Sequence, residues 1–137
     1  MYKLTKNGEP ILLTDSITRP NGLAFFPDGK KLLVASSDPH AANWYVVNTD
    51  EPMASLTLFY SVTAQRDGLK GLPDGLKIDK NGNVFASGPG GLWIFNRDGN
   101  VLGKIKFDEV ASNVSLSADE TTLYITNNRQ VLRMRLR

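Results

Sequence analysis

The feature of this sequence that most constrains its fold is an internal repeat of short extended segments joined by tight turns. Residues 21–36, 74–87 and 113–126 align by eye, and they start 53 residues (21 to 74) and 39 residues (74 to 113) apart. Each segment has the pattern of strand, turn and strand. Asp28-Gly29 and Asn81-Gly82 are strong hairpin signals, because such turns need positive φ angles. The repeat therefore predicts successive antiparallel β units.

Further apolar runs follow each hairpin. A third strand is expected in every unit and a fourth in the first two; the runs are 44–47, 92–95, 131–134, 56–62 and 101–107. Four short strands in about 40–50 residues is the spacing of propeller blades. The fold class predicted is all-β, a partial β-propeller of about three blades of four-stranded antiparallel sheets. It forms one domain over 1–137, with a blade end at 1–18, blades at 19–64 and 72–108, and a blade start at 111–137.

Composition removes several kinds of function. The 137 residues contain no cysteine and one histidine, which excludes a thiolate nucleophile, a cysteine-ligated metal and a multi-histidine metal site within one chain. A net charge of +2 gives no sign of a nucleic-acid or membrane partner. The chain has no apolar run of membrane-spanning length and no signal-peptide core. We expect a soluble protein, cytoplasmic, or periplasmic if a leader belongs to a longer parent.

Four strings in a specific order resemble one family. They are RPNGLAF at 19–25, LPDGLKID at 72–79, GPGG at 88–91 and LYIT at 123–126. Together they resemble the C-terminal half of the senescence marker protein/gluconolactonase/luciferin-regenerating enzyme family. The resemblance implies a six-bladed propeller, a divalent metal at the top of its central channel, and hydrolysis of sugar lactones or related esters. It also implies that the N-terminal half of the family supplies a metal-binding glutamate and a further asparagine, neither of which has a counterpart here.

Three polar residues stand where the innermost strand of each predicted blade begins. Equivalent positions in successive blades converge on the axis, so Asn21, Asp74 and Asn113 are expected to meet. Their oxygens suit a hard cation. The alternative is that Asn-Gly and Asp-Gly are ordinary turn pairs and that these side chains bond their own backbone. By resemblance, Asn21 and Asp74 are metal ligands, Asp74 is also the catalytic base, and Asn113 lines the channel. The cofactor expected is Ca²⁺, with Zn²⁺, Mg²⁺ or Mn²⁺ as alternatives.

The loops between second and third strands open at the same mouth as these residues. Ser36, His40 and Gly90 are therefore candidates to line a substrate pocket, with a plain surface loop as the alternative for His40. Residues 63–72 lead directly to Asp74 and are expected to form either a lid or a solvated loop.

These observations leave three functional hypotheses. The first is a metal-dependent hydrolase acting on a small lactone or ester, of which the isolated chain holds only part of the metal site. The second is a non-catalytic propeller piece that serves as a binding or scaffold module. The third is a homodimer in which two copies complete the ring and cover exposed sheet edges.

Overall fold

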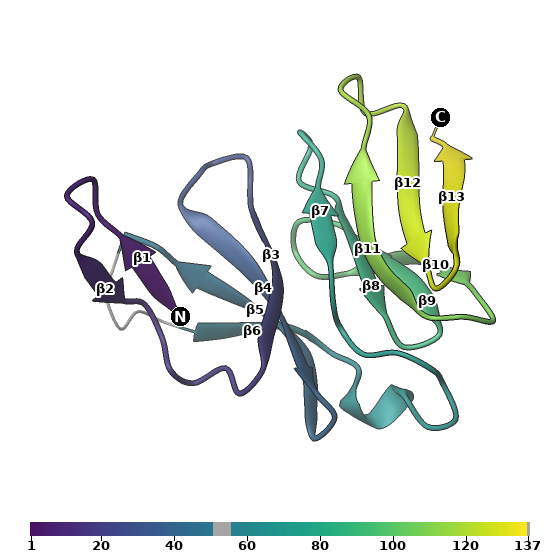
Figure 1. Ribbon diagram of the computed structural model, residues 1–137, viewed down its shortest axis with the longest axis horizontal. Coiled ribbons are helices and arrows are strands. Elements are labelled where there is room, and N and C mark those ends of the chain that lie inside the picture. Colours follow the sequence, from purple (N-terminus) through teal and green to yellow (C-terminus); the bar gives the residue numbers. More distant parts are fainter. Residues whose placement is uncertain (51–55, 137) are drawn as a thin grey trace.

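The computed structural model describes residues 1–50 and 56–136, so positions 51–55 of the predicted blade 19–64, and Arg137, lie outside the described residues. The described chain forms antiparallel sheets that fan out one after another in chain order (Figure 1). This confirms the prediction of an all-β, partial propeller. No helix in the described residues is long and apolar enough to cross a membrane.

Each sheet is built from consecutive strands in meander order. The first pairs β1 (Tyr2–Leu4) with β2 (Pro10–Leu12). The second contains β3 (Pro20–Phe25), β4 (Lys31–Asp38), β5 (Ala41–Asn48) and β6 (Leu56–Ser61). The third contains β7 (Leu76–Ile78), β8 (Val84–Gly88), β9 (Gly91–Phe95) and β10 (Val101–Lys106). The fourth contains β11 (Ala111–Leu116), β12 (Thr122–Asn127) and β13 (Gln130–Arg135).

The two predicted hairpin turns form for the expected reason. Gly29 and Gly82 have φ angles of 69° and 86°, which glycine adopts without steric cost. In the first turn, the Asp28 carboxylate accepts hydrogen bonds from the backbone N–H groups of Lys30 and Lys31, at 2.9 and 3.2 Å. Each turn lies at the far end of its inner strand, β3 or β7, and the contact of Gly22 with Asp74 and Gly75 places the beginnings of these two strands at the same mouth.

An aromatic cluster joins the two four-stranded sheets. Trp44 on β5 lies with its ring centroid 6.1 Å from that of Trp93 on β9 and 5.3 Å from that of Phe95. Both tryptophans are fully buried, and Phe59 and Phe26 extend the same cluster. The matched positions of the two tryptophans in their third strands therefore reflect packing between blades.

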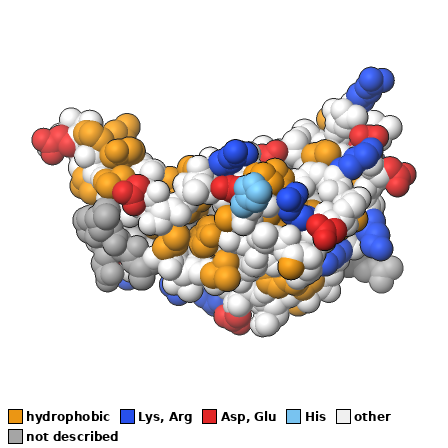
Figure 2. All heavy atoms as spheres, turned by 90° about the horizontal axis from the view of Figure 1, so that it is seen from below, with side chains coloured by type: hydrophobic (Ala, Val, Ile, Leu, Met, Phe, Trp, Pro, Cys, Tyr) orange, Lys and Arg blue, Asp and Glu red, His pale blue; other side chains and the backbone are white. Residues whose placement is uncertain are grey.

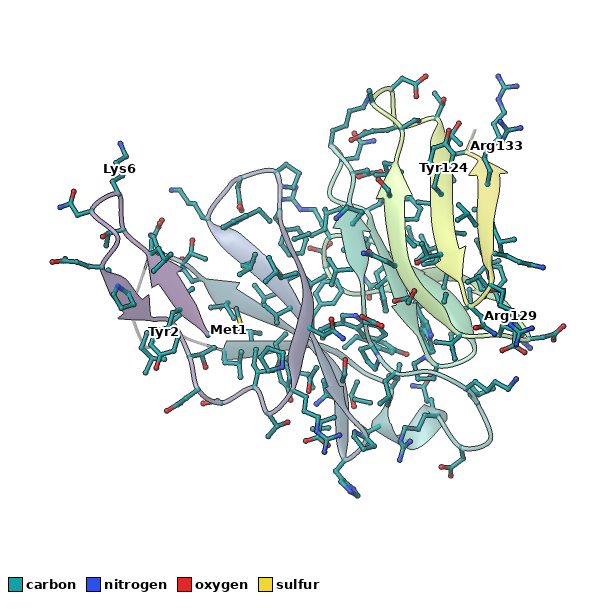
Figure 3. All side chains as sticks on the ribbon, in the orientation of Figure 1. Met1, Tyr2, Lys6, Tyr124, Arg129 and Arg133 are labelled. Carbon is teal, nitrogen blue, oxygen red and sulfur yellow. The ribbon has the colours of Figure 1, made fainter. Side chains whose placement is uncertain are left out.

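Two smaller cores continue this packing along the fan. Leu32, Val34 and Val47 pack with Leu13 and Ile17, and a separate cluster joins the β7–β10 sheet to the β11–β13 sheet. The sheets at the two ends carry exposed side chains, among them Tyr2 and Tyr124, which lie at opposite ends of the array (Figure 3).

The connection from β6 to β7 holds one short 3₁₀ turn, η1 (Thr63–Gln65). Farther along, the Gly90 N–H donates a 2.8 Å hydrogen bond to the Lys70 carbonyl, which ties this connection to the β8–β9 turn. A lid function for residues 63–72 stays a prediction.

Candidate functional site

The candidate site lies where β3, β7 and β11 begin, with β7 between the other two. Backbones approach unusually closely here. A Cβ added to Gly22 would overlap the Asp74 carbonyl oxygen, and one added to Gly75 would overlap the Asn113 side chain and lie 2.7 Å from its Cα. The chain therefore brings Asn21-Gly22, Asp74-Gly75 and Asn113 side by side, although they are far apart in sequence.

The starts of these strands differ from the sequence prediction by one or two residues. Asn21 is the second residue of β3, Asp74 precedes β7 by two residues, and Asn113 is the third residue of β11. Both asparagines lie inside their strands because the strand pairing is irregular there. The register shifts between Pro20 and Leu23 in β3 and between Ala111 and Asn113 in β11. Gly22 and Gly75 have φ angles outside the left-handed region, so they permit close backbone approach rather than a positive-φ turn.

The Ser37 hydroxyl on β4 connects the Asn21 side chain to the segment that precedes Asp74. The Asn21 Nδ2 donates to the Ser37 Oγ at 3.0 Å, and the Ser37 Oγ donates to the Pro73 carbonyl at 2.6 Å. Ser37 lies near the end of β4, so these two hydrogen bonds connect the β3–β6 sheet to the segment that precedes β7. Asn21 is exposed, whereas Asp74 is half-buried.

The surroundings of the Asp74 carboxyl shift its pKa. Burial raises the pKa of this carboxyl above its ordinary value, because a buried carboxylate loses hydration. Hydrogen bonds from the Asn21 side chain and the Gly75 N–H act in the opposite direction and lower the pKa, but burial is the larger effect. A carboxylate with a raised pKa is a stronger base, which suits removal of a proton from water.

Backbone hydrogen bonds fix the segment that carries Asp74. The Asp74 N–H donates to the Ser87 carbonyl at 3.2 Å, and the Gly75 N–H donates to the Ser112 carbonyl at 2.8 Å. The buried Ser87 hydroxyl donates to the Gly75 carbonyl at 2.9 Å, with the Ser112 carbonyl at 3.3 Å. The position of Asp74 is therefore set by contacts to β8 on one side and to β11 on the other.

Asn113 reaches the same place, but its side chain is already engaged. Its Oδ1 accepts a 2.8 Å hydrogen bond from the Val114 N–H, which is the local bonding weighed as the alternative for this residue. The Thr126 hydroxyl donates to the Asn113 carbonyl at 3.2 Å. The Asn113 oxygen therefore has one of its two lone pairs occupied by its own backbone.

The loop candidates lie apart from this hydrogen-bond chain. His40 is exposed in the β4–β5 turn, where its N–H donates to the Asp38 carboxylate at 2.8 Å (Figure 2 shows this face, with the single histidine in pale blue). Gly90 has a φ of 77° and lines a cavity of about 480 Å³ with Lys104 and Lys106 on β10. Ser36 is fully buried, and its hydroxyl has no hydrogen-bond partner among the described residues.

Sequence reasoning named Ser36 and overlooked Ser37. Side chains alternate along a strand, and the core residues Leu33 and Ala35 share the β4 face that packs toward the next sheet. Ser37 continues that face, whereas Ser36 continues the face of Leu32 and Val34 toward the preceding sheet. Counting by twos from the apolar positions of β4 is the signal that selects Ser37.

The donor set has a clear chemical preference. The Asn21 amide and the Asp74 carboxylate offer oxygen ligands, which fit Ca²⁺ or Mg²⁺ rather than a soft metal. Within residues 1–50 and 56–136, no group of three or more histidine or acidic side chains is close enough to hold a metal by itself. The described chain can thus supply part of the oxygen ligands of a hard cation.

Comparison with known proteins identifies the family of this chain. The family model for the SMP-30/gluconolactonase/LRE-like region matches residues 1–129. The chain belongs to this family. This SMP-30/gluconolactonase/LRE-like chain is 39% identical over 141 residues to a gluconolactonase of Zymomonas mobilis, an alignment that covers 98% of the chain and 40% of that relative.

Solved structures give the same result for the fold. A gluconolactonase from Xanthomonas campestris superposes with a TM-score of 0.83 and 29% identity over 99% of this chain and 44% of its own. A calcium-binding protein, regucalcin, from Agrobacterium tumefaciens has a TM-score of 0.73 and 23% identity over 94% of this chain and 44% of its own, which is a likeness of fold. The SMP-30/gluconolactonase/LRE-like chain thus spans less than half the length of these relatives.

Proposed function

We propose that this chain forms part of the active site of a lactone hydrolase, in which Asn21 and Asp74 bind a divalent cation. The single observation that carries the proposal is the close backbone approach of Asn21-Gly22 to Asp74-Gly75, which places the Asn21 side chain within hydrogen-bonding reach of the Asp74 carboxyl. Membership of the family and the 39% identity to a gluconolactonase support the reaction class. Ca²⁺ is the cation expected first, because both donors are oxygens and regucalcin, a structural neighbour, is calcium-binding.

The chemistry needs one base and one polarising group. A divalent cation held by Asn21 and Asp74 would polarise the lactone carbonyl oxygen and so make the lactone carbon electrophilic. The Asp74 carboxylate accepts a proton from the attacking water, whose oxygen forms a bond to the lactone carbon. The ring C–O bond then breaks, and the leaving ring oxygen takes the proton that Asp74 accepted from the water, which gives the hydroxy acid and restores the Asp74 carboxylate. The close backbone contacts at Gly22 and Gly75 hold the two cation ligands in register during this sequence.

A titration with paired variants tests this proposal. We expect Ca²⁺ to bind the chain in isothermal calorimetry, and Asp74→Asn to abolish that binding together with any gluconolactone hydrolysis above the spontaneous rate. Asp98→Asn is the matched control, since Asp98 is an exposed acidic residue in the β9–β10 turn at the other mouth. Equal Ca²⁺ affinity in the Asp74→Asn variant and the wild type would falsify the cation site.

The same titration separates the alternative functions. A chain that binds neither Ca²⁺ nor Zn²⁺ would favour a non-catalytic binding or scaffold module. The homodimer stays a prediction, motivated by exposed apolar side chains on the end sheets, where Leu4 and Val131 are 68% and 72% exposed. Light scattering that finds only a monomer at high concentration would remove it.

A further inference from the structure

A cavity of about 480 Å³ lies between the β6–β7 connection and β10, the edge strand of the β7–β10 sheet. Residues 68–70 of the connection, 89–93 at the β8–β9 turn and 104–108 at the end of β10 form its wall. Its volume is typical of small-molecule pockets. Asn21 and Asp74 do not line it, so the cavity is separate from the proposed cation site.

The pairing of β9 with β10 explains why this space is open. Lys104 lies opposite Trp93, and Lys106 lies opposite Gly91, so no side chain fills the position across from Lys106. Gly91 has a φ of 138°, and a Cβ added there would overlap the Ile105 carbonyl oxygen. Only glycine fits this position without moving the backbone, and its missing side chain leaves room beside the two lysines.

The wall of the cavity carries positive charge that the described chain does not compensate. Lys104 and Lys106 are two positions apart on β10, so their side chains share one face of the strand. Neither forms an ion pair within residues 1–50 and 56–136, whereas Lys70, the third lysine of the wall, pairs with Glu109 at 3.3 Å. Asp108 is the one acidic residue among the described residues that line the cavity.

Lys104 is held against the wall rather than free in solvent. Its Nζ lies 3.3 Å from the centroid of the Trp93 ring, a cation–π contact. Trp93 is fully buried, and its Nε1 donates a 3.1 Å hydrogen bond to the carbonyl of Pro89, which lines the same cavity. The ammonium group is therefore in place before a ligand arrives, which reduces the entropy cost of binding an anion.

We propose that this cavity binds a small anionic molecule whose carboxylate or phosphate group accepts hydrogen bonds from Lys104 and Lys106. Leu69 and Phe107 supply an apolar wall for the rest of the molecule. The inference goes beyond the proposed hydrolysis and stands without it, because it needs neither a cation nor Asp74. A neutral lactone lacks the group that these lysines recognise, whereas the hydroxy acid formed by its hydrolysis carries a carboxylate.

The experiment follows the indole N–H signals of the full chain in ¹⁵N–¹H spectra without metal. Sodium gluconate, sodium phosphate and the neutral polyol sorbitol are titrated separately at constant ionic strength. The Trp93 signal is the reporter, because Lys104 lies over its ring. The Trp44 signal is an internal reference, because Trp44 does not line the cavity and its Nε1 has no hydrogen-bond partner among the described residues.

Three variants test the role of the lysines. Lys104→Met and Lys106→Met remove one charge each and keep a long side chain. Lys6→Met is the matched control, because Lys6 is an exposed lysine in the β1–β2 turn at the far end of the array (Figure 3). We expect each of the first two variants to weaken anion binding by about 10-fold, the usual effect of losing a hydrogen bond to a charged group. Lys6→Met should bind as the wild type does.

The order of the two anions identifies the ligand group. A saturable shift of the Trp93 signal at lower gluconate than phosphate concentration supports a carboxylate ligand, and the reverse order supports a phosphate ligand. The proposal is overturned if neither anion shifts that signal more than sorbitol does. It is also overturned if Lys104→Met and Lys106→Met bind as tightly as Lys6→Met. Should Lys104→Met fail to fold, Lys106→Met decides by itself, since its charge is not the one over the indole.

These spectra contain neither a metal ion nor a lactone. Loss of anion binding and loss of the proposed cation site are therefore separate results.

Discussion

Replacement of Gly22 by alanine tests the close contact on which the site depends. The new methyl group would overlap the Asp74 carbonyl oxygen and lie 2.8 Å from the Gly75 Cα, where an ordinary contact begins at 3.4 Å. The two inner strands would therefore have to separate by about 0.6 Å or more. Neither contact atom belongs to a flexible side chain, so the backbone itself must move.

The backbone around Asp74 resists that movement. Its position depends on the hydrogen bonds of the Asp74 and Gly75 N–H groups and on the two that the Gly75 carbonyl accepts from Ser87. Overpacking of a well-packed site costs about 1–3 kcal/mol, and each hydrogen bond weakened adds up to about 1 kcal/mol. We expect Gly22→Ala to lower the free energy of unfolding by about 2–4 kcal/mol.

Urea unfolding followed by circular dichroism measures this change. Gly103→Ala is the control, because Gly103 lies in β10, has an ordinary φ and would have no atom within 4 Å of an added Cβ. That variant should stay within about 0.5 kcal/mol of the wild type. The reasoning is refuted if Gly22→Ala is as stable as Gly103→Ala, since the backbones at the hub would then have room to separate freely.

Two further predictions concern polar groups. Ser87→Ala removes a fully buried hydroxyl that donates to the Gly75 carbonyl, so it should lower the free energy of unfolding in urea by about 1–2 kcal/mol. Ser115→Ala, on the exposed face of β11, should change that free energy little. Equal stability of the two variants would contradict this prediction. Hydrogen bonds from the Ser117 hydroxyl and from the N–H and hydroxyl of Thr121 lower the pKa of Asp119 below its ordinary 3.8. The stability that the ionised Asp119 contributes is therefore present above that value and is lost as the pH falls through the folded-state pKa. Asp119→Asn should therefore show a smaller drop in urea midpoint than the wild type between about pH 6 and pH 3, and an unchanged drop would exclude the contribution.

Much of the fold follows from local pattern. The positive-φ glycines at 29 and 82 and the apolar runs after them predict hairpins and third strands, and these depend only on neighbouring residues. The matched tryptophans at 44 and 93 could likewise be assigned to packing, because equivalent positions in equivalent sheets face each other.

The details of the site depend on contacts between sheets, which local pattern does not encode. The register shift near Asn113 turns its side-chain oxygen onto the Val114 N–H, and a bulge of this kind is set by pairing with β12. The choice between Ser36 and Ser37 depends on which face of β4 meets the next sheet. Gly22 stands in what could be an ordinary turn pair, and only the position of the β7 backbone gives it another role.

The pairing of Trp44 with Trp93 has a practical consequence for anyone who studies this protein in solution. The sequence contains two tryptophans, both buried at the one boundary between the β3–β6 and β7–β10 sheets. Tryptophan emission, excited selectively, therefore reports on the opening of that boundary and not on fraying of β11–β13, which contains Tyr124 but no tryptophan. A transition seen by amide exchange in β11–β13 but missing from the emission spectrum would be the signature of a last sheet that detaches by itself.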